Sequence, residues 1–297
     1  MNTTTMKTLA VALGCLCAFA AARAQDRIAV PLSEPSRPAT LEINTLGSRI
    51  NVSAYDGKEI VIATRTPTAR EEADDDEQPR QGLQGRQAPR APQAPRGRAR
   101  GDDGSSIEGL HRVTNNSVGM TATEENNVVT LKTDFSHQAL ALDISVPRNT
   151  SVHAKTVNGD LTVTGVSGDH EISSVNGRLV ANDLVGSVVA STTNGTIRAS
   201  FADVAANKAM SFNSFNGNVD VTFPAKLSAT FRVSSGRGEF YTDFDVTLQP
   251  QAPVVTQGGQ NGRYEVKMER ETVATVGRGG PDIRFKTFNG NVMIRKR

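Results

Sequence analysis

Few residues of this chain have the type and spacing that catalysis requires. Enzymes that cut acidic polysaccharides gather several carboxylates on one face, because cleavage needs a metal ion or a general acid and base at the scissile bond. The most regular part of the chain offers Asp160 and Asp169, which are half a repeat apart and are therefore expected on opposite faces. Asp160 has Arg178 as its neighbour one repeat on, and we expect an exposed ion pair worth roughly 0.2–1 kcal/mol.

Other chemical motifs are incomplete. The histidines (His111, His137, His153 and His170) lack ligand spacing, and we interpret inward-placed His170 as a buried, hydrogen-bonded imidazole. Gly165-Val166-Ser167-Gly168 lacks the second spacer of a nucleophile elbow, and Gly277-Arg278-Gly279-Gly280 precedes a strand, where a phosphate loop precedes a helix. The Asp that follows paired glycines in calcium-binding nonapeptide repeats is missing. The sequence thus predicts no enzyme activity, no metal and no cofactor.

The first residues resemble an export signal. Lys7 precedes an apolar run from Thr8 to Ala21, and Ala22-Arg23-Ala24 has the small residues that signal peptidase recognises. We expect a signal peptide over residues 1–24, cleavage between Ala24 and Gln25, and a mature protein in the periplasm, on the cell surface or outside the cell. The alternative is a lipid anchor on Cys15. The run is too short to cross a bilayer, and no later segment reaches the length of a transmembrane helix.

Composition narrows the classes of partner. The chain has 33 Lys and Arg against 31 Asp and Glu, and cleavage would remove Lys7 and Arg23, which leaves the two signs balanced. Such balance argues against bulk attraction to nucleic acid or membranes. Both cysteines, Cys15 and Cys17, lie in the segment to be removed, so the mature chain would have no thiol for a disulfide or a metal.

One long segment lacks the apolar pattern of a folded domain. Residues 65–112 contain an acidic block, Glu71 to Glu77, and then an Arg, Gln and Pro-rich stretch through Arg100. Little apolar area is available there to offset the entropy of ordering, which predicts a disordered linker between leading strands at 25–64 and a main domain at 113–297. The alternatives are a polyanion-binding arm and, at Arg100-Gly101-Asp102, a receptor-binding tripeptide.

A repeat organises the main domain. Glycines recur every nine residues from Gly159 to Gly195, and the second and fourth positions after each glycine share one side of a strand. The inward residues predicted in this way are Leu161, Val163, His170, Ile172, Leu179, Ala181, Val188, Ala190, Ile197 and Ala199, with a further apolar column at Val157, Val166, Val175 and Leu184. Burying a charge at Val188 should therefore cost several kcal/mol, whereas Ser187→Asp should cost little.

The full repeat is two such units long. Asn-Gly pairs recur every 18 residues and return later in the chain; the predicted corners are Asn158-Gly159, Asn176-Gly177, Asn194-Gly195, Asn216-Gly217 and Asn289-Gly290. Gly and Asn tolerate positive φ, and stacked corners would align the Asn amides in a hydrogen-bonded ladder. The pattern predicts an all-β, single-stranded β-solenoid, similar to a parallel β-helix, with about 18 residues per coil. Ordinary antiparallel hairpins are the alternative, although they need no equal spacing.

These corners also carry a family resemblance. The strand from Leu142 to Pro147, the serial corners, Val219 to Pro224, and the closing stretch from Gly279 to Val292 resemble the bacterial putative-adhesin family of β-strand-repeat domains of unknown function. The resemblance covers residues from about Asp134 to the C-terminus, with Leu41 to Thr64 as leading strands. It implies an exported β-solenoid with an adhesin-like role and no catalytic motif.

The sequence therefore predicts an exported, non-enzymatic scaffold of the envelope or cell surface. Its outward Thr, Ser, Asn and Arg rows would contact a repetitive partner such as a glycan or another envelope component, and not nucleic acid. One alternative is a carbohydrate-active β-helix enzyme with catalytic residues in loops such as Thr247 to Arg263. Another is a scaffold that displays the Arg-rich linker to polyanions.

Overall fold

The protein is all-β in the part of the chain that the structure describes. The computed structural model describes residues 26–65, 120–133, 140–249, 254–260, 263–269 and 271–297. Within these ranges every regular element is a β-strand, and twenty of the strands form one hydrogen-bonded sheet. The predicted signal peptide, its cleavage site at Ala24 and Gln25, and nearly all of the predicted linker lie outside the described residues.

The sheet doubles back to form two layers that face each other across the core. In order of pairing, the first layer contains β5 (Met120–Glu125), β6 (Val128–Thr133), β2 (Ala39–Asn44), β8 (Thr150–Asn158), β10 (Ser167–Asn176), the second half of β11 (Leu179–Asn194), β13 (Met210–Asn216), β21 (Asp282–Asn289), β15 (Ala229–Ser235), β20 (Thr272–Val276) and β17 (Val246–Gln249).

The second layer runs alongside the first. It contains β1 (Asp26–Pro31), β4 (Glu59–Arg65), β7 (Leu140–Pro147), β3 (Ser48–Tyr55), β9 (Leu161–Thr164), the first half of β11, β12 (Ile197–Val204), β14 (Val219–Phe223), β22 (Val292–Lys296) and β16 (Phe240–Thr242). Strand β11 continues through both layers, which is why they count as one sheet. A separate antiparallel hairpin joins β18 (Val254–Gln260) to β19 (Arg263–Glu269).

The central strands pair in parallel at the interval of the sequence repeat. Asn158, Asn176 and Asn194 are partners across β8, β10 and β11 in the first layer. In the second layer Leu179 is the partner of both Leu161 and Ile197. The next step, from Asn194 to Asn216, is four residues longer, and the chain makes a turn between β12 and β13 where the sequence indicates an insertion.

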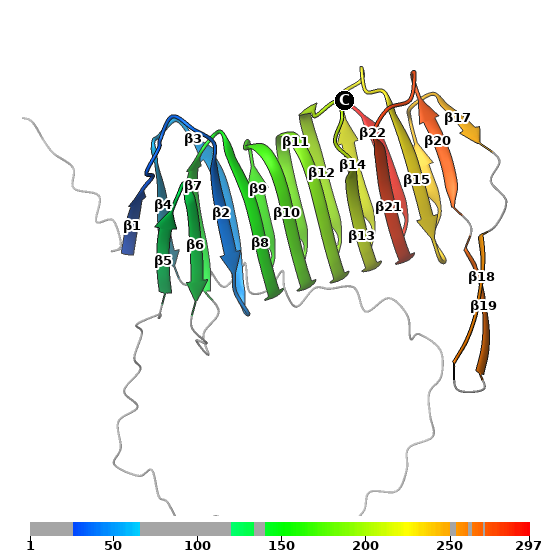
Figure 1. The fold of residues 1–297 in the computed structure, drawn as a ribbon, viewed down its shortest axis with the longest axis horizontal. Coiled ribbons are helices and arrows are strands. Elements are labelled where there is room, and N and C mark those ends of the chain that lie inside the picture. The colour runs from blue at the N-terminus through cyan, green and yellow to red at the C-terminus, as the bar shows by residue number, and fades with distance from the viewer. Residues whose placement is uncertain (1–25, 66–119, 134–139, 250–253, 261–262, 270) are drawn as a thin grey trace, which may run out of the picture.

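The order of the strands in space differs from their order in the chain at both ends. Strands β2 and β3 lie between the β6/β7 pair and the β8/β9 pair. Near the other end, β21 and β22 lie between β13/β14 and β15/β16. Figure 1 shows both insertions, as blue strands among green ones and as the red C-terminal strands beside β13 and β15. The four inserted strands are thereby paired with neighbours on both sides.

Antiparallel strands close the two ends of the parallel stack. At one end β5 pairs with β6, and β4 pairs with both β7 and β1. At the other end β20 lies between β15 and β17. An exposed parallel edge would offer unpaired N–H and C=O groups to other chains, and these reversed strands cover much of it.

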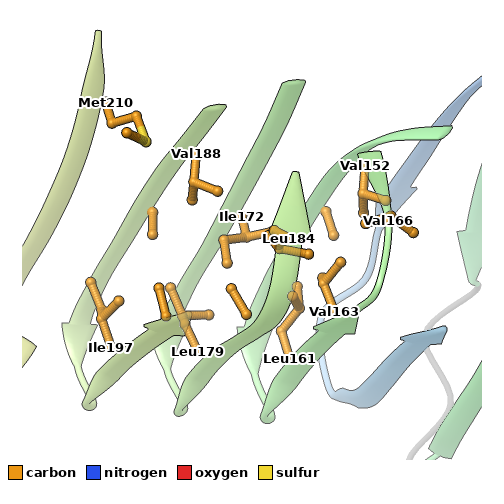
Figure 2. Packing of buried hydrophobic residues seen from close by; sticks show 14 of the residues in the cluster. Val152, Leu161, Val163, Val166, Ile172, Leu179, Leu184, Val188, Ile197 and Met210 are labelled. Carbon is orange, nitrogen blue, oxygen red and sulfur yellow. The ribbon is translucent and has the colours of Figure 1, made fainter. Parts of the chain in front are cut away.

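The core lies between the layers and follows the repeat. All ten inward positions that the nine-residue spacing predicts are buried, and Figure 2 shows several of them between the strands of the two layers. Toward the C-terminal half the core becomes aromatic, with Phe201, Phe212, Phe223, Phe231 and Phe285 fully buried and their rings in contact. The further column is partly wrong: Val166 and Leu184 are buried, but Val157 is only partly buried and Val175 is 42% exposed. Just before an Asn-Gly corner, the residue that points inward is the one two places before the Asn, and not the one immediately before it.

Candidate functional site: the Asn-Gly corner and its groove

The five predicted Asn-Gly corners lie on one edge of the stack and are linked through their side chains. Every ladder Asn except Asn158 donates its Nδ2–H to the Oδ1 of the Asn on the neighbouring strand, at 2.8–2.9 Å. The resulting ladder runs Asn158, Asn176, Asn194, Asn216, Asn289. Its last rung comes from β21, which pairs with β13 although seven strands separate the two in sequence.

The glycines of these corners are required mainly by close approach of the backbone. A Cβ on Gly195 would lie 1.9 Å from the carbonyl oxygen of Gly177, and one on Gly177 would lie 2.1 Å from that of Gly159. Positive φ explains only part of the pattern. Gly159 has φ of 137°, but none of the ladder asparagines has positive φ. The suggestion that these Asn residues serve a left-handed turn is therefore wrong, and their amide hydrogen bonds are their contribution.

A buried column of hydroxyl groups supports the corner and was missed at the sequence level. The residue two places before each ladder Asn is Ser or Thr and points inward; these residues are Thr156, Ser174, Thr192, Ser214 and Thr287. Four of them donate to the carbonyl oxygen of a corner glycine at 2.9–3.4 Å. A buried C=O needs such a partner. Recurrence of Ser or Thr every 18 residues was the signal available in the sequence.

We expect Asn176→Ala to cost about 1–2 kcal/mol of unfolding free energy, because Asn176 takes part in two amide hydrogen bonds, one as donor and one as acceptor. Asn289→Ala at the end of the ladder removes only one such bond and should cost about half as much. Urea unfolding of both variants measures the difference. Equal losses would contradict a ladder in which an interior Asn makes two amide hydrogen bonds and a terminal Asn makes one.

The two carboxylates of the central repeat, Asp160 and Asp169, each make contacts with other residues and do not face each other as a catalytic pair. Asp160 accepts a hydrogen bond from the backbone N–H of Arg178 at 2.7 Å, and the Arg178 guanidinium lies 3.9 Å away. Asp169 lies at the start of a strand in the other layer, where Ser187 and Lys208 donate to it. The Lys208 ammonium is the largest cause of a lowered pKa of the Asp169 carboxyl. This shift is opposite to the one that a general acid needs, whose pKa is raised toward neutral pH.

His170 is buried but only half of its hydrogen-bonding capacity is used. The side chain is 3% exposed, and its Nδ1 accepts the backbone N–H of Val152 at 3.3 Å. Its Nε2 has no partner among the described residues, which differs from the expected satisfied imidazole. Burial lowers the pKa of His170 from 6.5 to about 4, and the nearby Asp169 carboxylate only partly opposes this shift.

This depressed pKa predicts acid sensitivity. The unfolded chain binds the proton more tightly than the folded one, so stability is fully present above pH 6.5 and is lost as the pH falls toward 4. Between pH 7 and pH 4.5 we expect His170 to account for about 2–3 kcal/mol of lost unfolding free energy. Urea titrations at both pH values should show a smaller loss in His170→Leu. A His153→Gln control that reduced the loss equally would contradict the assignment to His170.

An exposed stripe of apolar side chains runs along the outside of the corner. Val175, Phe215 and Phe288 each immediately precede a ladder Asn and are 41–51% exposed. The rings of Phe215 and Phe288 stack 5.0 Å apart with an interplanar angle of 8°. Beyond Phe288 the Arg237 guanidinium lies 5.4 Å from its ring centre. On the other side of Phe215, the register places Thr193, which interrupts the stripe.

A groove of about 640 Å³ opens at this interruption. Its walls come from β10, β11, β13, β21 and β15, so it crosses the strands of the first layer. Besides the two rings, its outward lining is polar, with Ser191, Asn213, Ser234 and Lys286 in one cross-strand row. No carboxylate lines it. A concave site with aromatic and hydroxyl groups side by side is suited to binding rather than to proton transfer.

The described ranges contain neither a metal-binding cluster nor a helical membrane span. No group of three His, Cys, Asp or Glu side chains there is placed to hold a metal ion. In the same ranges no helix has the length and apolar character of a membrane span. The stretch from Thr247 to Arg263, which we expected to be a loop, contains most of β17 and all of β18.

Comparisons with known proteins are sparse. No protein-family model and no curated protein matches the chain. Two crystal structures align over most of it. One is a putative cell adhesion protein from Clostridium sporogenes, with 9% identity, a TM-score of 0.42, and coverage of 92% of this chain and 100% of that one. The other is a putative adhesin from Bacteroides fragilis, with 9% identity, a TM-score of 0.28, and coverage of 93% and 98%. At these TM-scores neither likeness carries an argument.

Proposed function

We propose that this chain is an exported, non-enzymatic scaffold of the cell envelope or cell surface with an adhesin-like role, in which a β-solenoid of about 18 residues per coil presents a glycan-binding edge. The observation that carries the proposal is the exposed Phe215–Phe288 stack beside a groove with outward hydroxyl and amide groups. Sugars combine apolar C–H faces with hydroxyl rims, and such a surface offers a partner to each.

The architecture supports a binding role. The side chains of the edge stand on strands that pair in parallel with neighbours on both sides, and the corner glycines and hydroxyls fix the spacing of the coils. A rigid platform loses little conformational entropy when it binds a ligand. The two conspicuous carboxylates, Asp160 and Asp169, are held in separate ion pairs, which favours binding over cleavage as the role of the edge.

A binding experiment with full-length mature protein tests the proposal. Labelled protein is sedimented with insoluble envelope polysaccharide, and bound protein is measured for wild type, Phe215→Ser and Tyr241→Ser. Tyr241 is a matched control because it is a similarly exposed ring on β16 of the other layer. We expect Phe215→Ser alone to reduce binding, roughly tenfold. If Phe215→Ser binds the polysaccharide as well as the wild type does, the contact lies elsewhere on the protein.

The enzyme alternative is tested in the same preparation. The protein is incubated with envelope and plant polysaccharides, and new reducing ends and unsaturated products are followed with time. We expect none above the rate of the heat-treated protein. Turnover that Asp160→Asn or Asp169→Asn abolishes would overturn the non-enzymatic role.

A further inference from the structure

We propose that the groove beside Phe215 selects an acidic glycan, a polymer of hexuronic acid residues whose carboxylates are bound by Lys286 and Arg237. This inference rests on the proposed function, because it assigns a ligand class to the same edge. It draws on three features of the groove: one open ring face, a row of uncharged hydrogen-bonding groups, and cations that no carboxylate of the groove neutralises.

The open ring face belongs to Phe215. Among the described residues its one ring partner is Phe288, and its neighbour on the other side in the register is the small Thr193. The face that Phe288 leaves free therefore borders the groove, in agreement with the 51% exposure of the side chain. Phe288 is less available, because a Cβ on Gly236 would lie only 2.6 Å from its ring. A sugar ring stacked on Phe215 would lie above Thr193.

The uncharged groups form the row next to the rings. Ser191, Asn213 and Ser234 project from β11, β13 and β15, with Lys286 between the last two. Neighbouring strands are about 4.8 Å apart, so these groups recur along the groove and across the strands. Hydroxyl and amide groups can both donate and accept hydrogen bonds, as the hydroxyls of a sugar do.

The cations of the groove favour a ligand that carries negative charge. Lys286 lines the groove, and no hydrogen bond or ion pair joins its ammonium group to another described residue. Arg284, two residues earlier, is exposed on the same side of β21, and Arg237 lies over Phe288. Lys155 occupies the same row four strands away but is neutralised by Glu171 at 2.8 Å. The groove end therefore presents positive charge with which no carboxylate of the groove pairs, and this favours a carboxylated ligand.

An uncharged glycan would leave Lys286 without a partner, and an acidic peptide would use the cations but not the flat face of Phe215. A uronate polymer uses both. Charged hydrogen bonds are worth more than neutral ones, so the carboxylate should contribute strongly to discrimination. The Arg-rich segment between Arg80 and Arg98 also attracts polyanions, and a useful experiment has to separate its contribution.

The experiment measures binding of the full mature chain to three probes by biolayer interferometry: polygalacturonate, the same polymer with its carboxylates methyl-esterified, and poly-L-glutamate. We expect polygalacturonate to bind at least about tenfold more tightly than either of the others. Lys286→Gln and Phe215→Ser should each weaken its binding roughly tenfold. The control is Lys155→Gln, which removes a cation of the same row outside the groove and should leave binding unchanged. The linker is identical in all variants, so a loss of binding in one variant reports on the groove and not on the linker.

Each contrary result has a distinct meaning. Equal binding of polygalacturonate and its methyl ester, both dependent on Phe215, would overturn acid selectivity and leave the glycan-binding function standing. Equal binding of poly-L-glutamate and polygalacturonate would show attraction by charge alone and overturn the inference. Loss of binding in Lys155→Gln as large as in Lys286→Gln would overturn the assignment to the groove. Failure of polygalacturonate to bind, while sedimentation with envelope polysaccharide still depends on Phe215, would overturn the uronate ligand alone.

Discussion

Gly195→Ala is expected to cost about 3 kcal/mol or more of unfolding free energy. The new Cβ would lie 1.9 Å from the Gly177 carbonyl oxygen, a distance at which either the two coils separate or the corner changes its path. Separation would lengthen the Asn194 to Asn176 hydrogen bond and the Thr192 hydroxyl contact with Gly177. Overpacked sites that cannot relax by moving a side chain cost more than ordinary surface substitutions.

The matched control is Gly47→Ala. Gly47 follows β2 at the corner of the coil that β2 and β3 form, but an added Cβ there would have no atom within 4 Å. We expect a change within about 0.5 kcal/mol, because only the flexibility of the unfolded chain is altered. Chemical unfolding followed by circular dichroism compares the two variants. Similar losses at both positions would show that the close stacking of the corner glycines is not what restricts them.

Leu179→Asp is expected to be the other severe substitution, with a loss of about 4 kcal/mol at neutral pH. Leu179 is fully buried, and its cross-strand neighbours, Leu161 and Ile197, are apolar. A carboxylate placed there has no partner. The loss should shrink as the pH falls, because protonation removes the buried charge. Urea unfolding at pH 7 and pH 5 measures both effects.

Val180→Asp provides the comparison, since Val180 points outward beside Thr162 and Arg198 and should lose less than about 1 kcal/mol. Leu179 and Val180 give a clearer comparison than Val188 and Ser187, the pair that the sequence suggests. A carboxylate at Val188 would lie across from His170, and one at Ser187 would face Asp169. A loss at Val180 as large as at Leu179 would mean that the inward and outward assignments of this strand are mistaken.

Much of the local structure is readable from the sequence because a strand has a period of two. The spacing of Leu161, Val163, Leu179 and Ala181 identifies the inward side, and parallel strands in register repeat that assignment coil after coil. The 18-residue interval of the Asn-Gly pairs also places their amides above one another. Such features depend on neighbours at a fixed distance along the chain, so one sequence suffices to find them.

The candidate site is less accessible to this reasoning. Phe215 and Phe288 are 73 residues apart, and their stack exists only because β21 pairs with β13. Val175 was assigned to the core because its spacing matches that of buried valines, whereas at the corner the chain turns and the inward position shifts to Ser174. Lys286 gave no signal in the sequence, because its significance comes from the polar row and the ring that it joins in space.

The amino-acid sequence by itself determined the strand content, most of the inward positions and the corners of the central repeat, since each of these follows from periodic spacing within a short stretch of chain. Only the tertiary structure decided that β2 and β3, and later β21 and β22, insert between pairs of strands from which they are distant in sequence. Parallel strands with similar inward faces can pair in many orders. Which order forms depends on the packing of all their side chains and on the antiparallel strands that close the ends.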